Sequence, residues 1–232
     1  MDSRSGRTFL HALQIADGAL PIGRFAHSYG LEAWLEANPQ AGAEALLELV
    51  RSTLSGSIAT LDGAGGALAH AAASSSDLGQ LRQIDAALTA RKLSDPARRA
   101  STLCGSRLAT LARDLNIGEV VDRLAAEIAG GAWAGNLSVV EGAVGAGMGV
   151  SREQTVLIAV RGHASAMLSS VVRLGRLGTT RSQALLFELT SDLENCAQTA
   201  TGVSLGDLRS TLPELEIHAA RHEQRDARLF MT

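Results

Sequence analysis

The sequence predicts an all-α fold, a single-domain helical bundle of about nine to ten helices with no sheet. The chain has 232 residues and is 46% hydrophobic but only 3% aromatic, so its core is built mostly from Leu, Ala, Val and Ile. Ala and Leu are strong helix formers. Apolar residues recur at three- and four-residue spacing in most segments, and no segment sustains the alternation of a strand. Because no linker or repeat divides the chain, we expect one domain over residues 1–232.

The first predicted helix ends at a tight link. We expect residues 1–7 to form a flexible polar tail, and apolar residues at helical spacing follow it up to Ala16. Asp17–Gly18 is a helix stop signal, and Pro21 prevents an ordinary helix across the link. A second helix is expected to begin near Ala26.

The third predicted helix leads into a glycine-rich segment. It starts near Ala41, and its apolar stripe extends to Leu61. Asp62–Gly66 has the composition of a loop, yet the apolar spacing resumes at Ala67. Two interpretations stay open here, a loop or a helix whose glycines allow a close helix contact.

Cap residues and composition define the helices that follow. Ser94 precedes a helix with Pro96 in its first turn, and Ser151 opens another with a capping box. The segment 136–149 is apolar and rich in small residues, which predicts a tightly packed, buried helix. The helix that begins after Ser151 is long and apolar, and we expect it to be the central helix of the core.

Charge, cysteine content and apolar pattern limit the kinds of partner. The net charge of −3 gives no field that attracts nucleic acid. Cys104 and Cys196 lie in helical contexts and indicate a reducing compartment. The first residues lack the apolar core of a signal peptide, and Arg, Glu or Gly interrupt every long apolar run. We therefore expect a cytoplasmic protein with no membrane partner.

Common catalytic motifs are missing from the sequence, although one stretch is dense in polar groups. We find no P-loop, no His-Glu-x-x-His and no Cys-x-x-Cys, and Lys92 is the only lysine. The stretch Leu13–Leu35 nevertheless combines many polar side chains with Tyr29, the only tyrosine. His27 and Ser28 are neighbours in sequence, an arrangement that suits helix capping better than a nucleophile with its base. We expect this stretch to dock a partner or to form a site.

Three histidines leave alternatives open. His218 and His222 are four residues apart, so on a helix they can share a metal ion. A polar helix face is the more common reason for such a pair. His163 lies inside the long apolar helix, where a hydrogen-bonded core histidine is more common than a ligand.

Glu141 is the only charge in the predicted buried helix. It either pairs with a buried arginine, such as Arg161 or Arg173, or lines a polar channel. The sequence does not favour one of these over the other.

The end of the chain, residues 213–232, combines charges with an apolar terminus. Arginines precede Leu229, Phe230 and Met231, a pattern that fits a docking peptide which becomes ordered on binding. A disordered terminus explains the composition equally well. If the end is a docking peptide, we expect it to lie near Leu13–Leu35, the other unusual stretch.

Two blocks of the sequence carry a family resemblance. The opening block reads Leu13-Gln14-x-Ala16-Asp17-x-x-Leu20-Pro21-x-Gly23-x-Phe25-x-His27-Ser28-x-Gly30-Leu31-Glu32. The closing block reads His222-Glu223-x-x-x-x-Arg228-Leu229-Phe230. With supporting blocks at 99–105 and 172–183, the chain resembles the UreF family of urease accessory proteins over nearly its whole length. It departs from the family pattern at Arg24, where a small residue is common, and at Met231–Thr232, where many members have Arg and Ser.

The resemblance implies a non-enzymatic, all-helical protein that acts as an adaptor and gate. Such proteins form homodimers, bind UreD (also called UreH) and recruit the GTPase UreG to apo-urease for GTP-dependent nickel insertion. Nickel is then the delivered metal and GTP is bound by UreG, so no cofactor is expected to be firmly bound by this chain.

The resemblance also assigns roles to residues. The implied partner contacts are Tyr29, Arg221, His222, Glu223, Arg228, Leu229 and Phe230. The implied support of the interface consists of Asp17, Pro21, Gly23, His27, Ser28, Gly30 and Glu32. Two other functions remain as alternatives, a carrier that binds nickel at His218 and His222, and an activator that supplies an arginine to UreG.

Overall fold

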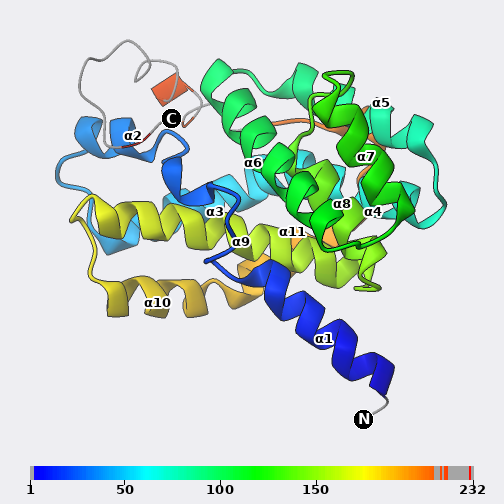
Figure 1. Ribbon diagram of the computed structural model, residues 1–232. Coiled ribbons are helices and arrows are strands. Elements are labelled where there is room, and N and C mark those ends of the chain that lie inside the picture. Colours follow the sequence, from blue (N-terminus) through cyan, green and yellow to red (C-terminus); the bar gives the residue numbers. More distant parts are fainter. Residues whose placement is uncertain (1–2, 212–214, 216, 219–229, 231–232) are drawn as a thin grey trace.

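The computed structural model describes residues 3–211, 215, 217–218 and 230, and in this part of the chain every regular element is a helix (Figure 1). The α-helices are α1 (Ser3–Ala16), α2 (Leu31–Ala37), α3 (Ala43–Thr53), α4 (Gly63–Ser74), α5 (Leu78–Arg91), α6 (Asp95–Asp114), α7 (Glu119–Ala129), α8 (Leu137–Gly147), α9 (Arg152–Arg173), α10 (Thr179–Glu188) and α11 (Thr190–Thr201). The shorter or wider elements are the 3-10 turns η1 (Arg24–Ala26) and η3 (Leu205–Asp207) and the π-helix η2 (Leu54–Asp62). The prediction of an all-α bundle is confirmed.

One continuous helical run settles the question of the glycine-rich segment. The elements α3, η2 and α4 follow each other without a break, so Asp62–Gly66 is helical and is not a loop. Counted as one helix, this run brings the described part of the chain to ten α-helices, within the predicted number. The glycines do allow close contacts, since a Cβ on Gly66 would lie 3.3 Å from the Ser138 carbonyl oxygen.

The start of the chain differs from the sequence prediction. Helix α1 already begins at Ser3, so most of the predicted tail 1–7 is helical. The helix contacts α9 and projects away from the other helices (Figure 1). Polar residues of the helix, such as Thr8 and His11, face the turn after α8. The second helix begins at Leu31 instead of near Ala26, for backbone reasons described below.

Two apolar clusters form the core. The first joins α2, α3 and η2 to α9, α10 and α11, with Leu46 and Leu168 among its fully buried members. The second joins α4, α5, α6, α7 and α8, with Leu81 and Leu124 among its members. Helix α4 contacts both α8 and α9, so it connects the two clusters. One face of α9 covers the first cluster, as expected for the central helix.

Helix α8 confirms the prediction of a buried helix with close neighbours. A Cβ on Gly142 would lie 2.4 Å from the carbonyl oxygen of Gly66 and 2.8 Å from the amide nitrogen of His70. Only glycine at this position lets the backbones of α4 and α8 approach so closely. The predicted caps are also present, because the Ser94 and Ser151 side chains accept the backbone N–H groups of Ala97 and Gln154.

A buried carboxylate connects α5 to the segment before α8. Asp85 on α5 is 3% exposed. Its side chain accepts the backbone N–H groups of Ala134, Gly135 and Asn136 at 2.7–3.1 Å, and the Asn136 side-chain amide donates to it at 2.9 Å. This one side chain therefore fixes the entry to α8.

Helix α9 is long and apolar enough to cross a membrane by length and composition alone. More than half of its most apolar part, 56%, is buried inside the protein. Because a core helix passes the same test, its properties are accounted for by its place in the first cluster.

Candidate functional site

The link between α1 and α2 is a turn with several left-handed residues. Gly23 and Gly30 both have φ +83°, and Tyr29 has φ +55°. A bulky side chain seldom adopts this conformation, and such strain persists only where surrounding contacts impose it. The turn explains why α2 starts late, since Gly30 is its N-cap residue. We call residues 23–32 the Tyr29 loop.

Contacts from two other helices hold the Tyr29 loop. The Arg107 guanidinium of α6 lies directly over Gly23, where a Cβ would be 2.0 Å from its Nη1 atom. On α9, the Ser170 hydroxyl shares its proton between the Ala166 carbonyl oxygen of its own helix at 2.9 Å and the His27 carbonyl oxygen at 3.3 Å. The Arg173 guanidinium donates to the Phe25 carbonyl oxygen. Side chains from distant segments therefore keep the loop in its strained form.

The predicted support residues lie mainly inside the protein. His27, Ser28 and Glu32 are buried, at 1%, 0% and 7% exposure. Burial lowers the pKa of His27, and the nearby Arg107 charge lowers it further. Asp17 lies in the link before the loop, where its carboxylate accepts the Ala19 N–H at 2.8 Å. Pro21 is exposed in the same link.

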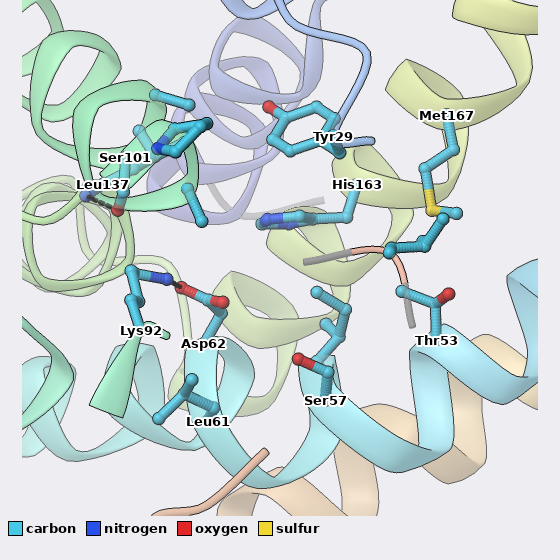
Figure 2. Close-up of a pocket in the computed structure, with 15 residues that line it drawn as sticks. Tyr29, Thr53, Ser57, Leu61, Asp62, Lys92, Ser101, Leu137, His163 and Met167 are labelled. Atoms are coloured by element: carbon cyan, nitrogen blue, oxygen red, sulfur yellow. Dashed lines mark hydrogen bonds and ion pairs between the residues drawn. The ribbon is translucent and has the colours of Figure 1, made fainter. Parts of the chain in front are cut away.

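Tyr29 lines a partly open cavity of about 100 Å³ that lies between the two apolar clusters (Figure 2). Its walls include Ile58 and Met167 of the first cluster and Leu61 and Leu137 of the second. Burial raises the pKa of the Tyr29 phenol above its ordinary value, and the positive charge of Arg24 only partly opposes this. The phenol is therefore neutral and can act as a hydrogen-bond donor inside the protein.

A buried ion pair lies on the opposite side of the cavity. The Lys92 ammonium donates to Asp62 Oδ1 at 2.6 Å, and the Ser138 hydroxyl donates to the same oxygen at 2.8 Å. Burial by itself would raise the pKa of Asp62, but Lys92, His163 and these hydrogen bonds together lower it to about 2. Asp62 is the last residue of the π-helix, an element often found at functional sites.

His163 lies between Tyr29 and this ion pair (Figure 2). Its ring centroid is 6.0 Å from that of Tyr29, and its Nδ1 atom is 3.1 Å from the Ala159 carbonyl oxygen. Because a carbonyl can only accept, Nδ1 carries the proton of the neutral ring and Nε2 is an acceptor. Burial lowers the pKa of His163, while the Asp62 charge opposes that effect. The expectation of a hydrogen-bonded core histidine fits this geometry.

The low pKa of Asp62 predicts how stability depends on pH. The folded-state pKa of the carboxylate lies below its ordinary value of 3.8. The ionised carboxylate therefore adds to the free energy of unfolding above about pH 4, and this stabilisation is lost as the pH falls toward 2. The difference corresponds to roughly 2 kcal/mol. In urea unfolding between pH 6 and pH 2.5, Asp62→Asn should weaken the dependence on pH below pH 4. The control Asp114→Asn, which removes an exposed carboxylate at the end of α6, should leave the dependence as in the unmodified chain. If the free energy of unfolding depended on pH in the same way in Asp62→Asn and in the unmodified chain, the prediction would be contradicted.

Glu141 has a partner that the sequence analysis did not name. Its Oε1 atom accepts from the Arg24 guanidinium, and both side chains are largely buried. The expectation of an arginine partner is confirmed, but the named candidates Arg161 and Arg173 are wrong, because the partner Arg24 comes from the Tyr29 loop. Arg24 reaches Glu141 across Gly162, where a Cβ would be 2.1 Å from the guanidinium.

A second, small cavity of about 20 Å³ lies beside this ion pair. Arg24 Nε, Glu141 Oε2 and Thr155 Oγ1 are buried atoms of its walls, and none of them has a hydrogen-bond partner among the residues that the structure describes. The cavity has room for one water molecule, which can accept from the guanidinium and donate to the carboxylate. The two ion pairs, Tyr29 and His163 thus give the interior an extended polar region.

The sequence did not identify Asp62 and Lys92 as site residues. Asp62 stood in a segment with loop-like composition, and Lys92 is 30 residues away in sequence. The one available signal was that Lys92 is the only lysine in the chain, which is unusual for a residue without a specific role.

Phe230 is the one implied partner contact of the predicted docking tail that lies in the described part of the chain. Phe230 is 5% exposed, and its backbone N–H donates to the Glu32 carboxylate at 3.3 Å. The end of the chain and the Tyr29 loop therefore meet, as we expected of the two unusual stretches. The other implied contacts lie outside the described residues, namely Arg221, His222, Glu223, Arg228 and Leu229.

The suggested histidine metal site can be followed only in part. His218 is half-buried, and His222 lies outside the described residues. Within the part of the chain that the structure describes, no three His, Cys, Asp or Glu side chains form a group that could hold a metal ion.

Comparisons with known proteins place this helical body and its loop in a family. The sequence model of the UreF family matches residues 41–190. The chain belongs to the UreF family. A urease accessory protein UreF of Yersinia pestis is 28% identical over 221 residues, which cover 95% of this chain and 96% of that protein. The UreF proteins of Yersinia enterocolitica and Yersinia pseudotuberculosis show the same identity and coverage.

The two kinds of comparison cover different parts of the chain. The matches to the Yersinia UreF proteins extend over nearly the whole chain, whereas the family model starts at residue 41, after the Tyr29 loop. UreF proteins are accessory proteins of urease, so this chain is a member of an accessory family and is not a urease catalytic subunit.

Proposed function

We propose that this chain is an adaptor and gate in the maturation of urease. In this role it binds UreD/UreH and recruits the GTPase UreG to apo-urease, where nickel is inserted in a GTP-dependent step. Nickel is the cargo, and GTP is bound by UreG. We further propose that the protein works in the cytoplasm as a homodimer, without nucleic acid or membrane partners.

The observation that carries this proposal is the meeting of Phe230 with the Tyr29 loop. Both belong to the blocks that resemble the family most closely, yet they are separated by 198 residues. Buried side chains impose a strained backbone on the loop, and strain of this kind is concentrated at functional sites. Within the site, the Lys92 ammonium is engaged in an ion pair with the Asp62 carboxylate. A surface that recognises a protein partner fits this arrangement better than a reaction centre.

The proposal is tested by shortening the chain. A variant that ends at Ala220 should lose at least about 90% of its co-purification with UreD, because partner contacts are expected in the removed residues. Its helical content by circular dichroism should remain, since α1–α11 all lie before residue 202. The control Phe187→Ala, which removes a phenyl ring that is 83% exposed on α10, should co-purify normally. Full UreD binding by the shortened chain would refute the docking role of the tail.

A further inference from the structure

The Arg173 guanidinium at the end of α9 lies between two aromatic rings. Its Cζ atom is 4.4 Å from the ring centroid of Phe230 and 5.5 Å from that of Phe25. Both distances are within the range of a cation–π contact. A planar guanidinium suits this position because it can stack on rings and donate hydrogen bonds at its edge at the same time.

The same guanidinium is hydrogen-bonded to the Tyr29 loop. It donates to the Phe25 carbonyl oxygen through Nη1 and to the Ser170 hydroxyl at 3.1 Å through Nη2. The Ser170 hydroxyl also lies 3.3 Å from the His27 carbonyl oxygen, and it shares its proton between this oxygen and the Ala166 carbonyl oxygen at 2.9 Å. Arg173 therefore connects the loop backbone to whatever occupies its other face.

The occupant of that face is the end of the chain itself. Phe230 is 5% exposed, although it is the third residue from the C-terminus. Besides its ring contact with Arg173, its backbone N–H donates to Glu32, which is 7% exposed. A terminal phenylalanine is thus held both by its ring and by its backbone.

We propose that Phe25, Arg173 and Glu32 form an aryl-binding seat, which the isolated chain fills with its own Phe230. The filled seat stabilises the strained Tyr29 loop, because Arg173 holds the Phe230 ring and the loop carbonyl through one side chain. Because such coupling is reciprocal, any contact that stabilises the Tyr29 loop also stabilises the bound position of Phe230. Phe230 is then an intramolecular anchor and a positioning residue that ties the end of the chain to the Tyr29 loop.

The inference concerns the isolated chain and needs no partner protein. Amide hydrogen exchange of the full chain is the direct test, because the Leu31 and Trp34 N–H groups close the turn by donating to the Ser28 and Gly30 carbonyl oxygens at 3.0 Å. Phe230→Ala removes the buried ring and its cation–π contact, and it should speed exchange at these two amides by about tenfold, which corresponds to about 1.4 kcal/mol.

Two controls separate the seat from general loosening. Phe187→Ala removes an exposed ring elsewhere and should leave the exchange of both amides unchanged. Phe230→Trp keeps an aromatic face for Arg173 and should retain most of the protection, whereas Phe230→Leu, which is apolar without a π face, should lose part of it. Unchanged exchange in Phe230→Ala, with exchange elsewhere also unchanged, would overturn the proposal.

The seat could also be filled by a second copy of the chain, and the same experiment decides this. Filling from the same chain predicts that protection of Leu31 and Trp34 does not depend on protein concentration. Protection that falls on dilution in the unmodified chain, but not in Phe230→Ala, would show filling between copies and would overturn the assignment to the same chain. These outcomes do not depend on UreD binding, so the proposed function can fail while the seat remains, and the reverse.

Discussion

Replacing Lys92 by methionine should lower the free energy of unfolding by about 3–5 kcal/mol, the usual cost of breaking a buried ion pair on one side. The Lys92 side chain is 7% exposed and its partner Asp62 is 12% exposed. Methionine fills much of the same volume but leaves the Asp62 carboxylate with the Ser138 hydroxyl as its remaining close donor. The change should be measured by urea unfolding near pH 7, where Asp62 is ionised.

Two further variants test whether the loss of stability in Lys92→Met comes from the unpaired charge of Asp62. The double variant Lys92→Met/Asp62→Leu removes both charges and should recover most of the stability, because an apolar pair avoids the cost of burying charge. Arg113→Met, at an exposed site on α6, should change the free energy by less than about 0.5 kcal/mol. A loss below about 1 kcal/mol in Lys92→Met would show that water solvates Asp62 in the folded protein.

Replacing Asp85 by alanine should cost about 4 kcal/mol or more. The substitution leaves the backbone N–H groups of Ala134, Gly135 and Asn136 without their acceptor, and each unsatisfied buried group costs about 1–3 kcal/mol. Asp85→Asn should cost less, because its amide oxygen still accepts one or two of these groups. Thermal unfolding of the three chains gives the order directly.

A control variant on the same helix tests whether the loss of stability in Asp85→Ala comes from the entry to α8. Asp77 is the N-cap residue of the same helix, α5, and its side chain accepts the Gln80 N–H at 2.9 Å. Asp77→Ala should cost only about 1 kcal/mol, the value of a cap. If both alanine variants lost the same amount, the effect would come from the helix start and not from the entry to α8.

Much of the fold could be predicted because helices are local. The apolar spacing and the caps at Ser94 and Ser151 depend on residues a few positions apart, and the structure confirms them. The buried nature of α8 was also predicted, since glycines such as Gly142 are tolerated in a helix only where a neighbour approaches closely. The early start of α1 was missed because polar residues in a first turn look the same in a tail and in an exposed helix.

The candidate site could be predicted only in part, because its contacts are not local. Helical spacing indicates which face of a helix is buried but not which residue lies opposite. Asp62 and Lys92 are 30 residues apart, and Arg24 and Glu141 are 117 apart. The link between the Tyr29 loop and the end of the chain was expected from unusual composition alone, and Phe230 now provides one atomic contact for it.

The π-helix η2 affects how the helices of the two apolar clusters are oriented relative to each other. Its nine residues wind more widely than an α-helix, so they set the angle at which α4 continues from α3. Asp62 closes this wide segment and faces Lys92 only at that angle. Loss of a single residue would rotate everything beyond it by about 100° in an α-helix, and by somewhat less in the wider π-helix between Leu54 and Asp62. The segment therefore tolerates substitutions far better than insertions or deletions, because its length fixes the relative position of the two apolar clusters.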